Sequence, residues 1–239
     1  MRHSISAEIA IVAFSFVALA QTPQSAPHDP HDLSGTWTRI SRILTMSNET
    51  PPMTAWGKAR FDAAKPVYGP RAVAGGLGND PLMTCDPVGM PRNLFLEVSI
   101  YPMEFIHTPN RVLQHFEWSN VYRQIWTDGR QLPKDPEPTW MGYSKGRWEG
   151  DTLIVETTGF NGKTWLDDDG HPQSEGAKVS ERIRRPDFWH LLDEITIEDP
   201  AMYAKPWSVT QEFRLAADGE LIEYVCGENN RDIPHLVGK

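Results

Sequence analysis

From about residue 94 onward, the chain alternates between short apolar segments with a period of two and turns that contain glycine. The clearest segments are residues 112–118, 122–127, 152–159, 179–185, 192–198, 208–215 and 220–226. Turn pairs typical of β-hairpins lie at Asp128-Gly129, Gly150-Asp151 and Asp218-Gly219. Short strands at regular spacing with turns of this kind predict an antiparallel β-sandwich or β-barrel.

Polar residues inside the apolar strands favour the barrel over the sandwich. Three strands carry a polar side chain on an otherwise apolar face: Gln114, Arg123 and Glu181. Buried polar groups need hydrogen-bond partners, and a barrel interior that holds a polar network or a ligand supplies them. We therefore predict a mainly all-β fold, an antiparallel, up-and-down, lipocalin-like β-barrel of about eight to ten strands.

The part of the chain before the barrel strands is less regular. Residues 54–65 have apolar side chains at helical spacing and end at a proline, which predicts a short helix. Residues 66–92 are rich in glycine and proline, so we expect an irregular loop there. One sizeable core suits a chain of this length, and we predict a single domain over residues 33–239.

The N-terminus has the pattern of a secretory signal peptide. An apolar run over residues 9–17 is followed by Ala18-Leu19-Ala20, a small-x-small cleavage pattern. The run is too short to span a bilayer, which takes about 20 apolar residues. We expect a signal peptide at residues 1–20 and a flexible, proline-rich leader at residues 21–32, with an uncleaved anchor as the alternative. The mature chain would then be secreted or periplasmic.

Charge and cysteine content narrow the class of protein further. The formal net charge of −9 argues against nucleic acid as a partner, because its binding rests on basic side chains. No later apolar segment of the sequence is long enough to enter a membrane. Cys85 and Cys226 are the only cysteines, and in an exported protein an even pair predicts a disulfide, with two buried thiols as the alternative. The bridge would join the loop before the barrel to the last predicted strand.

The middle of the chain resembles a family of exported bacterial proteins. The resemblance rests on TWMGYSKGRWEGDTLIVETTGFN at residues 139–161, and it extends to CDPVGMPR at residues 85–92 and EYVCGEN at residues 223–229. It implies a lipocalin-type (calycin-like) barrel, which is an analogy of architecture and not of activity. Where relatives are expected to read HPHSE, this chain has Gln173 in place of the second histidine. That difference weakens any site that needs two histidines there.

The residues after this motif offer acid–base chemistry. The candidates are Asp167, Asp168, Asp169, His171 and Glu175. A carboxylate that is hydrogen-bonded to an imidazole fixes its tautomer and raises its basicity, which makes a general base. We predict His171 as the base and Asp167 or Glu175 as the residue that orients it. The alternative is a solvated acidic turn, because Asp-Asp-Asp-Gly-His-Pro is also good turn chemistry.

Aromatic and charged side chains complete the predicted site. Trp140, Tyr143 and Trp165 would form a wall against which an apolar ligand stacks. Arg123 would bind a carboxylate or an enolate of the substrate, and Glu181 on a neighbouring strand would extend the acid–base set. The alternative for Arg123 and Glu181 is cross-strand ion pairing.

Two other chemistries have weaker support. Residues 142–146 match G-x-S-x-G formally, but a nucleophile elbow needs a strand–turn–helix context and a β-hairpin follows here. We therefore expect Ser144 to be a turn residue. The acidic cluster also contains calcium-type oxygen ligands, but its spacing does not match the EF-hand loop, so no metal is assigned.

These patterns together predict an exported enzyme that binds and transforms a small, partly apolar organic molecule in a barrel pocket. Its chemistry would be acid–base catalysis without a cofactor, as in a lyase, an isomerase or a hydrolase. The alternative is a lipocalin-like carrier that uses the same aromatic side chains without catalysis. A third possibility is an envelope protein whose barrel is filled.

Overall fold

The computed structural model of the chain describes residues 26–40, 46, 49, 51–67, 69–73, 77–95 and 101–227. The predicted signal peptide and the first part of the predicted leader lie outside the described residues. Among the described residues, no helix is both long enough and apolar enough to cross a bilayer.

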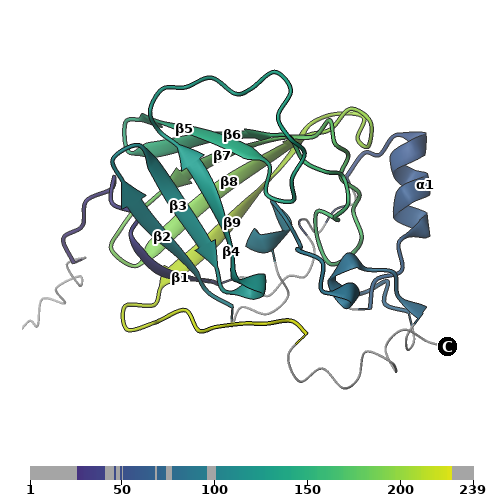
Figure 1. Cartoon of the computed structure of the whole chain (residues 1–239), viewed down its shortest axis with the longest axis horizontal. Coiled ribbons are helices and arrows are strands. Elements are labelled where there is room, and N and C mark those ends of the chain that lie inside the picture. Colours follow the sequence, from purple (N-terminus) through teal and green to yellow (C-terminus); the bar gives the residue numbers. More distant parts are fainter. Residues whose placement is uncertain are drawn as a thin grey trace, which may run out of the picture.

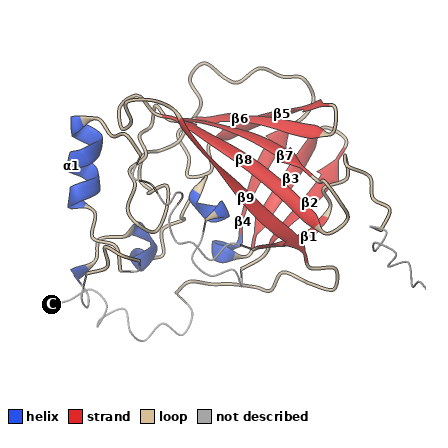
Figure 2. Cartoon of the chain, turned by 180° about the vertical axis from the view of Figure 1, so that it is seen from behind, coloured by secondary structure: helices blue, strands red, loops and turns tan. Residues whose placement is uncertain are grey.

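Nine strands of the described chain form a closed barrel (Figures 1 and 2). They are β1 (Gly35–Arg39), β2 (Met103–Thr108), β3 (Arg111–Phe116), β4 (Val121–Trp126), β5 (Tyr143–Glu149), β6 (Thr152–Thr158), β7 (Lys178–Arg184), β8 (His190–Glu198) and β9 (Trp207–Leu215). Each strand pairs with the next, and β1 closes the barrel by pairing with β9. All pairs are antiparallel except β4 with β5, which run parallel. The predicted lipocalin-like, mainly all-β barrel is confirmed, with one parallel pair as the difference.

Alternation along the strands decides which side chains fill the barrel. In β7, Val179, Glu181 and Ile183 are buried and the residues between them are exposed. The other strands contribute inward residues with the same period, since successive side chains of a strand point to opposite faces. The largest buried apolar side chains of the core include Trp37, Phe95, Phe105, Phe160 and Tyr203.

The strand β5 includes Ser144, a residue that the sequence predicts in a turn. Ser144 lies in β5 and is buried, so the prediction that it is a turn residue is wrong. Gly142, which directly precedes β5, has a φ of +68°, a conformation that favours glycine. Gly146 lies within β5, where a Cβ atom would come 2.8 Å from a methyl group of Ile125. Glycine is required there by close packing and not by a turn.

The predicted last strand at residues 220–226 does not form. Both edges of β9 are already hydrogen-bonded, one to β8 and the other to β1, so the segment that follows has no free edge to join. It takes an irregular path in which Ile222 N–H donates to Glu117 Oε2 at 2.9 Å. The sulfur atoms of Cys85 and Cys226 are 2.13 Å apart, which confirms the predicted disulfide. It ties down this irregular segment and not a strand.

One end of the barrel is covered by the described residues between β1 and β2 and by residues 159–177, the loop between β6 and β7 (Figures 1 and 2). The covering part contains α1 (Ala55–Ala63) and the 3-10 helices η2 (Pro81–Thr84) and η3 (Arg92–Leu94), while η4 (Trp118–Asn120) links β3 to β4. α1 confirms the predicted helix, and Thr54 caps it by accepting the N–H of Gly57 at 3.0 Å.

The opposite end of the barrel is contacted by the described part of the predicted leader. His31 Nε2 lies 2.9 Å from the carbonyl oxygen of Gly150, in the turn between β5 and β6. Arg185, after β7, donates to the carbonyl oxygen of Asp32 at 2.6 Å. Residues 26–32 therefore pack on the barrel where they are described.

Candidate functional site

The acidic loop between β6 and β7 is buried and not solvated. Asp167, Asp168 and His171 are 0%, 2% and 3% exposed, so the alternative of a solvated acidic turn is wrong. The loop folds back on itself, because Leu166 N–H donates to the carbonyl oxygen of His171 at 2.7 Å. Gly170 makes the turn between them with a φ of +86°, a conformation that favours glycine. This turn brings the side chains of Asp167 and His171 together.

Asp167 and His171 form a hydrogen-bonded pair. Nδ1 of His171 lies 2.7 Å from Oδ2 of Asp167. The same carboxylate accepts backbone N–H groups from Met46 at 2.8 Å, Asp169 at 3.0 Å and His171 at 3.3 Å. Burial opposes ionisation of Asp167, but the contacts with His171 and the backbone N–H groups outweigh it and hold the pKa of Asp167 below its usual value. An ionised carboxylate only accepts, so this contact favours the tautomer of His171 with its proton on Nδ1 and its lone pair on Nε2.

Aromatic side chains surround the imidazole of His171. Phe61 of α1 stacks on it with 4.7 Å between ring centroids, and Trp207 of β9 lies 6.1 Å away at a tilt of 55°. Tyr203 lies 5.4 Å from the Trp207 ring, and its hydroxyl donates to the carbonyl oxygen of Pro172 at 2.8 Å. Burial raises the pKa of Tyr203, so this hydroxyl stays protonated. The imidazole is thus packed between aromatic rings while its Nδ1 stays hydrogen-bonded to Asp167.

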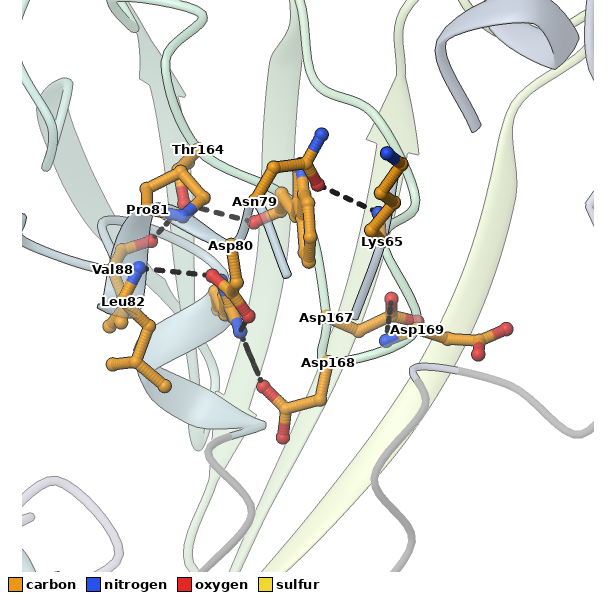
Figure 3. Close-up of polar contacts among 12 residues, drawn as sticks. Lys65, Asn79, Asp80, Pro81, Leu82, Val88, Thr164, Asp167, Asp168 and Asp169 are labelled. Atoms are coloured by element: carbon orange, nitrogen blue, oxygen red, sulfur yellow. Dashed lines mark hydrogen bonds and ion pairs between the residues drawn. The ribbon is translucent and has the colours of Figure 1, made fainter. Parts of the chain in front are cut away.

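Asp168, which follows Asp167 in the loop, belongs to a second buried cluster. Arg92 of η3 donates to Asp80 at 2.7 and 2.6 Å and to Asp168 at 3.1 and 2.7 Å, and all three side chains are buried. Burial raises the pKa of Asp168 more than Arg92 lowers it. Figure 3 shows the side chains of Asp168 and Asp169 pointing away from each other. The pKa is lowered at Asp167, which contacts His171 and backbone N–H groups. The pKa is raised at the neighbouring Asp168, where burial dominates.

Several buried polar atoms of η3, of the loop between β6 and β7 and of the start of β9 lack a hydrogen-bond partner among the described residues. Among the described residues, the buried side-chain atoms here that lack a hydrogen-bond partner are Asn93 Oδ1, Asp168 Oδ2, Asp169 Oδ1, His171 Nε2, Gln173 Oε1 and Trp207 Nε1. Buried polar atoms of native proteins are nearly always paired, and each exception calls for an explanation such as a catalytic role. The amide nitrogen of Gln173 donates to the carbonyl oxygen of Met90 at 3.0 Å, which leaves its Oε1 without a partner.

Two other predicted residues of the loop have different surroundings. Trp165 packs beside the Arg92 cluster, with the guanidinium carbon 5.5 Å from the ring centroid. Glu175 is exposed, whereas the oxygen atoms that contact His171 come from Asp167. Of the two predicted orienting residues, the structure therefore places Asp167 at the imidazole.

The other predicted wall residues lie in contacts of their own. Trp140 lines an apolar surface hollow of about 280 Å³ together with Met141. The hydroxyl of Tyr143 accepts a hydrogen bond from Arg130 at 3.1 Å. The structure thus places these two aromatic residues in surroundings other than the rings around His171.

Arg123 and Glu181 pair with each other inside the barrel. Two N–H groups of Arg123 donate to the two carboxylate oxygens of Glu181, one of them at 2.9 Å. The others donate to Ser144 at 2.8 Å, Thr157 at 2.6 Å and Gln114 at 3.3 Å. These contacts use all five N–H groups of the guanidinium and connect five adjacent strands, β3 to β7. The structure therefore separates this pair from His171 and builds it into the barrel core.

A further buried carboxyl belongs to the same interior cluster. Asp193 of β8 is 1% exposed. Burial and then the nearby charge of Glu181 raise the pKa of Asp193 well above its usual range, which favours the protonated form. With Asp193 neutral, the charges of Arg123 and Glu181 balance inside the barrel.

Comparisons with known proteins add no assignment to this picture. No protein-family model, curated protein or solved structure matches the chain. The resemblance to an exported bacterial family therefore stays a prediction, while the barrel that it implies is present. Within the described part of the chain, no group of three or more His, Cys, Asp or Glu side chains is placed to hold a metal ion.

Several residues of these clusters were not predicted as site residues: Phe61, Asp80, Arg92, Asp193, Tyr203 and Trp207. Most of them approach their partners from segments distant in sequence, so no local pattern marks them. Asp193 is the exception, because the alternation of β8 places it on the same inward face as Leu191 and Ile195. Its inward position can therefore be predicted from the alternation of residues along β8.

Proposed function

We propose that this chain is an enzyme that transforms a small, partly apolar organic molecule by acid–base chemistry without a cofactor. The observation that carries the proposal is the buried Asp167–His171 pair, whose outer nitrogen, His171 Nε2, has no hydrogen-bond partner among the described residues. A neutral imidazole that is oriented by a carboxylate is a general base of the kind that lyases, isomerases and hydrolases use.

The two residues of the pair would have different tasks. Asp167 stays ionised, so it fixes the orientation of the imidazole and stabilises the imidazolium that forms when Nε2 takes a proton. The rings of Phe61 and Trp207 would keep water away and contact the apolar part of the substrate. Electrostatic interactions are stronger in such surroundings than in water.

The proposed site lies between the loop and the barrel end and not in the barrel interior. Side chains such as Trp37, Phe105 and Arg123 fill the interior and are at most 1% exposed. A lipocalin-like carrier would hold its ligand in that interior. The carrier alternative therefore has less support than the enzyme.

A matched pair of variants tests the proposal. His190 also pairs with an aspartate, since its Nδ1 lies 2.9 Å from Asp187, but this pair is partly exposed and lies at the opposite end of the barrel. Turnover would be followed by NMR in D₂O over a panel of lactones, esters, hydroxy acids and enolisable ketones. We expect at least one compound to be turned over by the wild type and by His190→Gln, and about a hundredfold more slowly or worse by His171→Gln. Unchanged turnover in His171→Gln, or no turnover across the panel, would contradict the proposal.

We also infer that the protein works in an oxidising compartment. Disulfides persist in secreted and periplasmic proteins and are rare in the cytosol. The Cys85–Cys226 bridge supports export in this sense. Mass spectrometry of the chain recovered from a bacterial periplasm or culture medium tests it, and we expect a mature N-terminus at Gln21. Recovery of the intact chain from the cytosol would speak against export.

A further inference from the structure

We propose that Trp207 and His171 together bind an uncharged carbonyl compound that carries a removable hydrogen on the carbon next to its carbonyl group. The indole N–H of Trp207 would hold the carbonyl oxygen while Nε2 of His171 faces that hydrogen. This inference rests on the proposed function and names the substrate class for its base.

The two ring nitrogens complement each other chemically. Both atoms are buried without a partner among the described residues, and His171 as a whole is 3% exposed. The two rings adjoin each other, with 6.1 Å between their centroids, so a ligand that contacts one ring lies beside the other. The indole nitrogen of Trp207 only donates, whereas Nε2 of His171 offers a lone pair when Asp167 holds the proton of Nδ1. A donor beside a base matches an acceptor oxygen beside an acidic hydrogen.

The charges around this pair favour an uncharged ligand. The carboxylate beside the imidazole is that of Asp167, whose pKa is held below its usual value, so it is ionised. Arg92 is already engaged by two aspartates, and Arg71 donates to backbone carbonyls. An added carboxylate or phosphate would therefore meet the negative charge of Asp167 in a poorly solvated place. A carbonyl group brings no charge and needs only the N–H of Trp207.

The reaction balances without another reactant. His171 Nε2 takes a proton from the carbon next to the carbonyl group, and the electron pair of that C–H bond forms a C=C bond. The π electrons of the carbonyl group move to its oxygen, which becomes an enolate hydrogen-bonded to Trp207. The imidazolium, stabilised by Asp167, then returns the proton to the same carbon or to a neighbouring position. The outcome is hydrogen exchange or isomerisation with no oxidant or reductant.

Hydroxyacetone, an uncharged α-hydroxy ketone, is the probe for this inference, and lactate is its charged counterpart. In protein labelled with ¹⁵N-tryptophan, the indole signal of Trp207 is identified by its loss in Trp207→Phe. We expect hydroxyacetone to shift this signal and lactate at the same concentration to leave it in place. We also expect hydrogen exchange at the α-carbon of hydroxyacetone in D₂O to be about a hundredfold slower in Trp207→Phe than in the wild type. Trp189→Phe is the control, because Trp189 is 41% exposed and precedes β8 at the opposite barrel end.

The outcomes separate this inference from the proposed function. One result would overturn the role of Trp207 alone. In it, His171→Gln is inactive, but Trp207→Phe catalyses hydrogen exchange of hydroxyacetone at the wild-type rate or the Trp207 signal does not respond to hydroxyacetone. The role of His171 as the base would then stand. If His171→Gln exchanges at the wild-type rate, the proposed function fails as well. Circular dichroism of each variant confirms that the comparison is between folded proteins, and Trp207→Tyr replaces Trp207→Phe if the latter does not fold.

Discussion

The guanidinium of Arg123 and the carboxylate of Glu181 neutralise each other inside a barrel that shields both from water. Every N–H group of Arg123 has an acceptor, which is the condition under which a buried charge is tolerated. Asp193 lies in the same interior, and its charged form would be a second negative charge beside Glu181. Whether Asp193 is protonated therefore affects the free energy of unfolding of the barrel.

The variant Asp193→Asn tests this at the scale of a single residue. A raised pKa in the folded state means that the folded protein binds this proton more tightly than the unfolded chain, so stability is lost as the pH rises above the ordinary aspartate pKa of about 3.9. We expect Asp193→Asn to lose less stability than the wild type between mildly acidic and neutral pH. At neutral pH it should be more stable by roughly 1–3 kcal/mol.

Urea denaturation at several pH values measures both effects. Asp218→Asn, in an exposed turn, is the control and should follow the wild type. A pH dependence in Asp193→Asn that runs parallel to that of the wild type would show that Asp193 is ionised in the folded protein.

Among the secondary-structure elements of the barrel cover, α1 contacts His171 through the ring of Phe61. Gly57 is its buried residue, and it packs so closely on Met202 that a Cβ atom would overlap the Met202 carbonyl group. Phe61, one turn further along, carries the ring that stacks on His171. The contact at Gly57 therefore sets how the imidazole is covered.

We expect Gly57→Ala to move α1 away from the barrel end, at a cost of roughly 1–3 kcal/mol. Thermal unfolding measures the cost, and the rate at which diethyl pyrocarbonate modifies His171 measures its exposure, which should increase. Lys58→Ala, on the exposed side of the same helix, should change neither quantity by much. A variant Gly57→Ala with wild-type stability and wild-type modification rate would mean that the contact with Met202 does not position α1.

At the scale of the whole molecule, the disulfide closes the chain around the barrel. Cys85 and Cys226 are 141 residues apart, and the chain-entropy model gives a loop of this length about 5 kcal/mol, with measured bridges commonly lower. We expect the double variant Cys85→Ala/Cys226→Ala to lose about 2–5 kcal/mol of unfolding free energy in urea. Dithiothreitol should produce a similar loss in the wild type and none in the variant. Equal stability of all samples would contradict a structural role for the bridge.

The barrel could be predicted because its information is local. The alternation of Val179, Glu181 and Ile183 along one strand is enough to show which face is inward. The place of Ser144 in β5 could not be predicted, because Gly142 and Gly146 on either side of it are typical of turns and the approach of Gly146 to Ile125 has no local signal. Residues 220–226 have a strand-like pattern, but whether a strand forms depends on a free edge, and β1 already occupies that edge of β9.

The candidate site could be predicted only in part, because only some of its contacts are between residues close in sequence. Asp167 and His171 are four residues apart, and one glycine turn brings them together, so their pairing is visible in the sequence. Trp207 and Phe61 reach the imidazole only because the barrel closes and α1 folds over its end. Such contacts depend on the complete fold and have no local signal.

The proposed function requires that Asp167 holds the proton of His171 on Nδ1 and leaves Nε2 as the base. The ¹⁵N spectrum of protein labelled at the histidine ring nitrogens measures this directly, with the signals of His171 identified by their loss in His171→Gln. At mildly alkaline pH we predict a protonated Nδ1 and an unprotonated Nε2 in the wild type, and loss of this preference in Asp167→Ala. A His171 ring that is protonated on Nε2 alone would contradict the account.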